Sequence, residues 1–317
     1  MRQSAETLAG RIAYYNLTAL DLSEVGIKNQ DKLWLRGGFP RSFLAKREDD
    51  SWTWRIQFVD TFLERDIPQL GSRMPAGTLG PFWRMLAHVH GGVFNASELG
   101  RAFGLSDHSM RAYLNLLAAT FTVRILKPWH ENLSKRQVKS PKVYISDSGL
   151  LHQLLDIRDE AGLKSNPKVG ASWEGFGIGQ VQRHLKASDR DCFFWGTHAG
   201  AELDLLVVRG RERLGFEFKR NAAPTLTQSM RVARKDLGLQ HLWVIQPGRH
   251  RYDLAEGIEA MPLGALLQKS RPPDRVWDID RTQNLRRTKV PSLGNGKNRD
   301  VPRRAMIATA TNGTRWN

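Results

Sequence analysis

The chain has 317 residues, which is enough for two or three domains, because a single hydrophobic core stops growing at about 250–300 residues. Its single cysteine, Cys192, excludes an intramolecular disulfide bond and a cysteine-based zinc site. The formal net charge of +16 fits equally a polyanionic partner such as nucleic acid and a role in solubility.

Part of the positive charge lies at the end of the chain. Residues 271–317 hold eleven Lys or Arg against four Asp, a net +7. Because this stretch has Pro, Asn, Arg and Gly without periodicity, we expect residues 270–317 to form a disordered basic tail. The first residues lack the apolar core of a signal peptide, and no run approaches the length of a membrane span. The sequence therefore predicts a cytoplasmic protein with no membrane partner.

The expected elements divide the chain into sections. These are a short N-terminal segment (1–30), a helical linker region (31–91), a winged helix-turn-helix (92–150), an α/β domain (170–268) and the tail (270–317).

Helices dominate the linker region. Asp50 or Ser51 is expected to cap a helix with aromatic residues at every fourth position, and Pro68 is expected to end it. A second helix is expected to begin near Pro81, since proline suits the first helical position.

Residues 92–150 show the order of a winged helix, in which two helices precede a hairpin. Ser97 is expected to cap a helix over 98–103, and Ser106 or Asp107 a longer one. Strands are expected at 121–126 and 142–145, with a basic loop between them. The residues predicted to contact nucleic acid are Arg111, Lys135, Arg136 and Lys139, and those in the loop suit phosphate contact more than base recognition. The alternative is a protein–protein module, since Arg111 is the only Lys or Arg of its helix.

The α/β domain is expected to contain, in order, a helix, three strands, a helix and a strand (αβββαβ). We expect the strands at 192–195, 202–208, 214–219 and 241–245, and the second helix at 225–237.

Strand alternation places Asp204, Glu217 and Lys219 on one face of a hairpin. Two carboxylates there can hold Mg²⁺, and a lysine beside them can orient the attacking water or help to deprotonate it. Glu174, on the preceding helix, could add a third carboxylate, so the candidate metal ligands are Asp204, Glu217 and Glu174, with Lys219 as a further catalytic residue. The alternative is a solvated hairpin face with a cross-strand ion pair. The glycines at 175, 177 and 179 suggest a helix that holds Glu174 loosely.

No Gly-x-x-x-x-Gly-Lys-Ser/Thr motif occurs in the chain, so we expect no ATP site and no ATP hydrolysis by this chain.

Several motifs in the chain resemble those of a prokaryotic family of P-loop (AAA-type) ATPases that carry the domain of unknown function 4143 (DUF4143). They are LRGGFP (35–40), TFLERDI (61–67), SPKVYISDSGL (140–150), WEGF (173–176) and AELDL (201–205). The resemblance covers about residues 4–267.

The resemblance implies a multidomain α/β protein with a helical linker, a winged helix and a PD-(D/E)XK nuclease-like domain. Residues 1–30 would be the remnant of the end of an ATPase core that is otherwise missing, through a gene truncation or a mis-called start. By this resemblance Glu174, Asp204, Glu217 and Lys219 fall on the nuclease-like positions. The implied partners are DNA and either a separate ATPase subunit or a second copy of the chain.

Three functions remain open at this point. They are a Mg²⁺-dependent nuclease-like enzyme acting on DNA, a non-catalytic DNA-binding module, and a truncated remnant of an ATPase.

Overall fold

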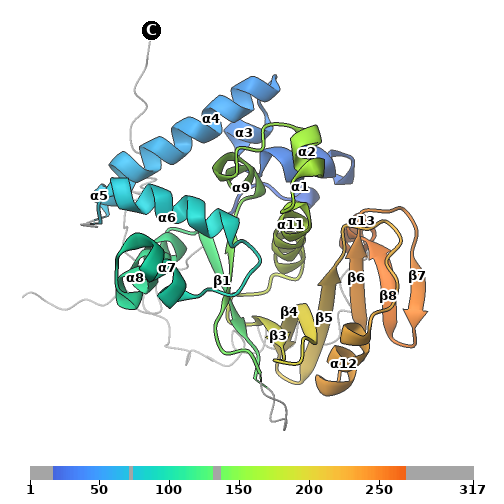
Figure 1. Cartoon of the computed structure of the whole chain (residues 1–317). Helices are drawn as coiled ribbons and strands as arrows, with labels where there is room; N and C mark the ends of the chain where they lie inside the picture. The colour runs from blue at the N-terminus through green and yellow to red at the C-terminus, as the bar shows by residue number, and fades with distance from the viewer. Residues whose placement is uncertain (1–16, 71–73, 131–136, 269–317) are drawn as a thin grey trace, which may run out of the picture. The chain divides into compact units, whose positions relative to one another are not determined.

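The computed structural model describes residues 17–70, 74–130 and 137–268 (Figure 1). A helical N-terminal region leads into an eight-stranded mixed sheet, which confirms the expected α/β class in outline. The expectations for residues 1–16, for Lys135 and Arg136, and for the basic tail lie outside the described residues.

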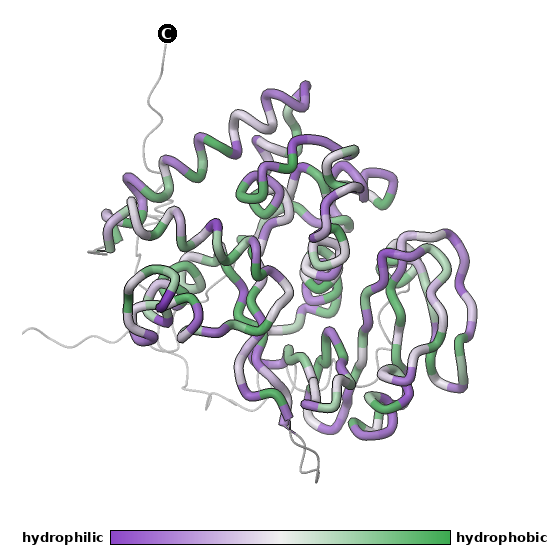
Figure 2. Tube along the Cα trace, in the orientation of Figure 1, coloured by the Kyte–Doolittle hydropathy of each residue, from purple (hydrophilic) through white to green (hydrophobic). Residues whose placement is uncertain are grey.

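The N-terminal region is built from short helices around one long one. They are α1 (Leu22–Val25), η1 (Ile27–Asn29), α2 (Gln30–Arg36), α3 (Pro40–Phe43), α4 (Glu48–Thr61), η2 (Phe62–Asp66), α5 (Ile67–Gln69) and α6 (Ala76–His88). Helix α4 is hydrophilic at its start and carries its hydrophobic residues in its second half (Figure 2). It starts before the expected cap at Asp50 or Ser51, with Arg47 at the cap position. The reason is that Glu48, Asp49 and Asp50 occupy the first turn, where carboxylates interact favourably with the helix dipole.

Both prolines used to place helix ends lie inside helical segments. The helix continues past Phe62 as a single π-helical turn and then as α5, of which Pro68 is the second residue. Pro68 removes one backbone hydrogen bond from this continuous helix, and the helix ends one residue later at Gln69. Pro81 lies within α6 and does not start it. Burial of Phe82, Trp83 and Leu86 along one face keeps the helix intact despite the lost backbone bond.

The two helices predicted next are present, with one cap corrected. They are α7 (Ala96–Phe103) and α8 (Asp107–Ala119). Asn95, not Ser97, caps α7 by accepting from the Glu98 N–H, whereas the Ser97 hydroxyl donates to Asp107 at 2.6 Å. Ser106 caps α8 as expected. After the first strands follow α9 (Ser148–Leu154), α10 (Glu160–Ser165) and α11 (Val169–His184).

The sheet joins the hairpin after α8 to the C-terminal strands. Its strands are β1 (Val123–Pro128), β2 (Lys142–Ile145), β3 (Cys192–Gly196), β4 (Glu202–Arg209), β5 (Glu212–Phe218), β6 (Leu242–Gln246), β7 (Tyr252–Ala255) and β8 (Ile258–Pro262). The spatial order is β2-β1-β3-β4-β5-β6-β8-β7. Strand β1 pairs antiparallel with β2 and parallel with β3. The hairpin of the predicted winged helix therefore forms one edge of the common sheet.

The expected order of helix, three strands, helix and strand is observed as α11, β3 to β5, α12 (Gln228–Asp236) and β6. Strands β3, β4 and β5 are antiparallel neighbours, and β6 runs parallel to β5. Strands β7 and β8 and helix α13 (Leu263–Gln268) were not predicted. Helix α12 packs on one face of this sheet through a core that includes Met230, Ala233, Leu203 and Leu242.

The glycines of α11 allow close packing on both of its neighbours. A Cβ atom at Gly175 would overlap Nε2 of His90, and one at Gly177 would overlap the ring of Phe218. Both glycines are buried in an unbroken helix. Their role is therefore to bring α11 against the sheet, which differs from the loosely held helix suggested by the sequence.

Replacing Gly175 with alanine should destabilise the protein by about 2 kcal/mol, although a helical Gly→Ala change usually stabilises. The matched control is Gly170→Ala in the same helix, where a Cβ would meet nothing within 4 Å and a gain of about 0.5 kcal/mol is expected. Urea unfolding of the two variants measures the difference. Equal effects of the two substitutions would show that α11 is not packed this closely.

Candidate active site

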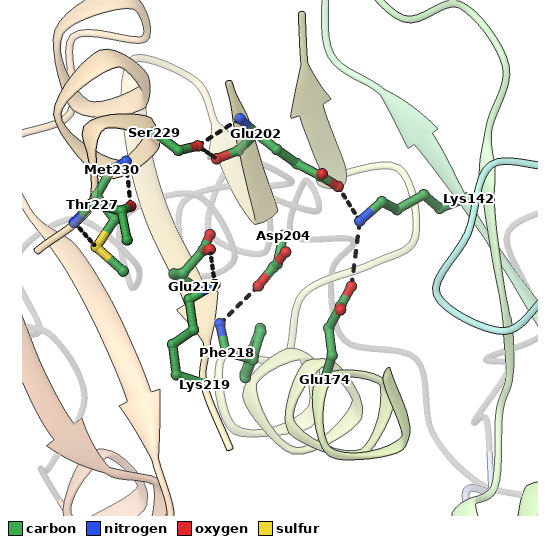
Figure 3. Close-up of polar contacts among 10 residues, drawn as sticks. All are labelled: Lys142, Glu174, Glu202, Asp204, Glu217, Phe218, Lys219, Thr227, Ser229 and Met230. Carbon is green, nitrogen blue, oxygen red and sulfur yellow. Dashed lines mark hydrogen bonds and ion pairs between the residues drawn. The ribbon is translucent and has the colours of Figure 1, made fainter. Parts of the chain in front are cut away.

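Two buried carboxyl groups, a half-buried one and a lysine come together where α11 meets β4 and β5. Asp204 lies on β4, Glu217 on β5, Lys219 just beyond β5, and Glu174 on α11 (Figure 3). Asp204 is 7% exposed and Glu217 is 6% exposed. The four residues predicted as the catalytic set are therefore neighbours in space, with Asp204 interacting electrostatically with both glutamates.

The strand backbone fixes Asp204 and leaves one oxygen of Glu217 without a partner. Oδ2 of Asp204 accepts a hydrogen bond from the Phe218 N–H at 2.8 Å. Nζ of Lys219 donates to Oε1 of Glu217 at 2.7 Å. Within the described part of the chain, the buried Oε2 of Glu217 has no hydrogen-bond partner. A buried polar atom left in this way is costly unless something outside the chain binds it.

Glu174 is held by residues that the sequence analysis did not single out. Tyr144 donates its hydroxyl to Oε1 of Glu174 at 2.5 Å, and Nζ of Lys142 lies 3.4 Å from the same oxygen. Lys142 also forms an ion pair with Glu202, at the start of β4. Lys142 and Tyr144 are two residues apart on β2, so strand periodicity places them on one face. The spacing alone could have predicted that Lys142 and Tyr144 share a face of β2. The residues around them do not indicate that this face contacts Glu174.

Burial and mutual repulsion shift the pKa values of the carboxyl groups upward. Burial, with the charge of Asp204, raises the pKa of Glu174 to about 7 and that of Glu217 to about 8. Burial also raises the pKa of Asp204, against the opposing effects of Lys142 and the Phe218 N–H. Burial is the largest cause of each shift, and the charge of Asp204 adds to it for the two glutamates, so the cluster favours the uptake of protons or of a cation.

For Lys219, burial lowers the pKa, but the charge and hydrogen bond of Glu217 outweigh it and raise the pKa above its usual value. The side chain therefore stays an ammonium ion at neutral pH. This favours its role as a hydrogen-bond donor and positive charge over a role as the base that removes a proton from water.

The carboxylate oxygens of this cluster suit a divalent cation that is held by only one or two protein ligands. Among residues 17–70, 74–130 and 137–268, no group of three or more His, Cys, Asp or Glu is arranged to hold a metal ion. Mg²⁺ in phosphoryl-transfer sites commonly uses one or two carboxylates and completes its shell with waters and phosphate oxygens. Asp204 and the open Oε2 of Glu217 meet that smaller requirement.

Two of the residues predicted to contact nucleic acid can be placed. Arg111 is exposed on α8, and Lys139 is exposed in the segment before β2. Lys135 and Arg136 lie outside the described residues. The prediction that these four residues contact nucleic acid stays untested by the structure.

A buried histidine ties β2 to α11 beside the site. Nδ1 of His90 accepts from the Ile145 N–H at 3.0 Å, so Nε2 carries the proton and donates to the Ala171 carbonyl at 3.2 Å. Burial lowers the pKa of His90 to about 3. The folded protein therefore keeps His90 neutral at pH values where the unfolded chain takes up a proton.

His90 should make the protein less stable in mild acid. Its ordinary pKa is about 6.5, so between pH 8 and pH 5 this group should lower the free energy of unfolding by about 2 kcal/mol. In His90→Gln the loss over the same pH range should be smaller by that amount, as measured by urea unfolding at each pH. Parallel pH profiles for the two proteins would contradict a neutral buried His90.

Two family models cover most of the described chain. Residues 169–266 match the domain of unknown function DUF4143. This DUF4143 region contains Glu174, Asp204, Glu217 and Lys219. Residues 27–161 match a second domain of unknown function, DUF8612, which contains Lys142 and Tyr144.

Curated relatives extend the similarity across both regions. Uncharacterized proteins of Mycobacterium tuberculosis and of Mycobacterium bovis are each 45% identical to this chain over 264 residues. The match covers 83% of this chain and 59% of each relative, so the chain spans less than two thirds of their length. No solved structure matches the chain. None of the helices formed by the described residues has the length and apolar character needed to cross a bilayer.

The site therefore spans the boundary between the two matched regions. The DUF4143 region supplies the carboxylates and Lys219, and the DUF8612 region supplies Lys142 and Tyr144 from β2.

Proposed function

We propose that the DUF4143 region is a nuclease-like domain that hydrolyses phosphodiester bonds of DNA with the help of Mg²⁺ or Mn²⁺. The observation that carries the proposal is the buried Asp204 and Glu217 pair with Lys219 beside it, in which Oε2 of Glu217 has no partner among the described residues. The order of helix, three strands, helix and strand around these residues supports the PD-(D/E)XK resemblance.

The residues would divide the chemistry as follows. Asp204 and Glu217 would hold the divalent ion, which supplies charge neutralisation and stabilises negative charge developing on the phosphate. The Lys219 ammonium group would donate a hydrogen bond to the attacking water and orient it toward phosphorus. Because the Phe218 N–H fixes Asp204 and strand β5 carries Glu217, these ligands are positioned before substrate arrives.

The basic composition of the chain supports nucleic acid as the substrate class. The same proposal includes a winged helix over residues 92–150, an ATPase as a partner and a location in the cytoplasm. Helices α7 and α8 followed by the β1–β2 hairpin agree with the order of a winged helix.

The test is cleavage of labelled single-stranded, double-stranded and branched DNA by the purified chain, with Mg²⁺, Mn²⁺ or EDTA. We expect cleavage that requires the metal, is lost in Asp204→Ala and is kept in Asp253→Ala, a matched change at an exposed position of β7. Metal-dependent cleavage that is unchanged in Asp204→Ala would show that the site is wrong. Salt-sensitive binding without cleavage would favour the non-catalytic DNA-binding module.

A further inference from the structure

Lys142 brings a positive charge into the carboxylate cluster from outside the DUF4143 region. Its side chain is 7% exposed, and its ammonium group contacts both Glu174 and Glu202. The same group lies 5.5 Å from the ring centroid of Phe194 on β3. Figure 3 shows Lys142 reaching the carboxylates from the side opposite Lys219.

The strand that carries Lys142 is firmly attached to α11. Tyr144 binds Glu174 directly, and His90 links the backbone of β2 to that of α11. The position of the Lys142 ammonium group is therefore set by the β1–β2 hairpin, which the DUF8612 region supplies.

Glu174 and Glu217 differ in what occupies their oxygens. Oε1 of Glu174 has two partners, Lys142 and Tyr144, whereas Oε2 of Glu217 has none within the described residues. Glu174 is therefore paired with a cation that β2 supplies. No group of three or more metal ligands is found among the described residues.

We propose that the ammonium group of Lys142 competes with the divalent metal ion for Glu174. The proposal rests on the metal site of the proposed function. An ammonium ion and a divalent cation that share one carboxylate repel each other, most strongly where water is excluded. Asp204 and Glu217 would therefore hold the metal ion while Lys142 occupies Glu174, and removal of the Lys142 charge would free Glu174 as a further ligand.

Because the β1–β2 hairpin carries Lys142, the hairpin supplies the positive charge that opposes metal binding at the carboxylates of the DUF4143 region.

The test is the dissociation constant for Mn²⁺, measured by titration calorimetry on the full chain. Lys142→Gln removes the charge and keeps a hydrogen-bond donor, and Lys142→Met provides a second variant with a side chain of similar length. We expect either variant to lower the dissociation constant at least about tenfold, because the repulsion of one buried positive charge is lost. Lys164→Gln, at an exposed position on α10, is the matched control and should leave the constant unchanged.

The outcomes separate this inference from the proposed function. Wild-type binding with equal or weaker binding by both Lys142 variants would overturn the competition and leave the metal site standing. Absence of Mn²⁺ binding by all the proteins would overturn the metal site and the competition together. Circular dichroism confirms that a variant is folded before its constant is compared.

Discussion

Replacing Lys219 with methionine should lower the rate constant of metal-dependent DNA cleavage by about 100-fold or more, the size found when a preorganised charged donor is removed. Methionine keeps most of the length of the side chain and removes the ammonium group. The proposed metal ligands Asp204 and Glu217 remain, so Mn²⁺ affinity should be kept or should rise, because a nearby positive charge is gone.

Single-turnover cleavage and Mn²⁺ titration of the same preparation separate these two effects. Lys235→Met, at an exposed position on α12, is the matched control and should change neither quantity. If Lys219→Met cleaved at the wild-type rate, the lysine would not take part in the reaction. If it lost metal binding and cleavage together, Lys219 would instead maintain the structure of the site.

Replacing Trp173 with alanine should destabilise the folded protein by about 4 kcal/mol, which is typical of removing a buried tryptophan. Trp173 is fully buried beside Glu174 on α11, with its ring 5.3 Å from that of Trp34 on α2. The Trp34 Nε1–H donates to the Ser172 hydroxyl at 2.9 Å, and His152 binds the same hydroxyl at 2.7 Å. Trp173 therefore stabilises the contact between the N-terminal helices and the helix that carries Glu174.

Two further variants sharpen this measurement. Trp173→Phe should cost only about 1 kcal/mol, because it also removes an Nε1–H that is buried without a partner among the described residues. Trp243→Ala, the same change at a half-buried position on β6, should cost about half as much as Trp173→Ala. Equal free energies of unfolding for the two Trp→Ala variants, from urea melts, would contradict the packing described for Trp173.

The C-terminal site residues could be predicted because strand geometry is local. Side chains alternate along a strand, and the hairpin formed by β4 and β5 brings Asp204 next to Glu217 and Lys219. The turn is also encoded locally, since Gly210 has a φ of 60°, a conformation that glycine adopts readily. These features can be read from a single stretch of sequence.

The role of Lys142 could not be predicted, because it depends on pairing between distant segments. The contact with Glu174 arises only because β1 adds to β3 in parallel, which places β2 near α11. No residue close to Lys142 in the sequence indicates that pairing. The role of the glycines of α11 could not be predicted either, because it depends on how closely His90 and Phe218 approach the helix in the folded protein.

Helix ends were predicted less well where tertiary packing decided them. Pro81 suits a helix start, but the buried face of α6 extends the helix on its N-terminal side to Ala76. Ser97 suits a cap, but Asn95 two residues earlier takes that position and the Ser97 hydroxyl binds Asp107. In both cases the residue is suited to the predicted position, but contacts made by neighbouring residues decide where the helix begins.

We propose that Asp204 and Glu217 form a divalent metal site. Anomalous diffraction from crystals of the chain grown or soaked with Mn²⁺ tests it most directly. We predict an anomalous peak bounded by the carboxyl oxygens of Asp204 and Glu217 that is absent from crystals of Asp204→Ala. Wild-type crystals with no peak between these two side chains at millimolar Mn²⁺, or with a peak that persists in Asp204→Ala, would contradict the site.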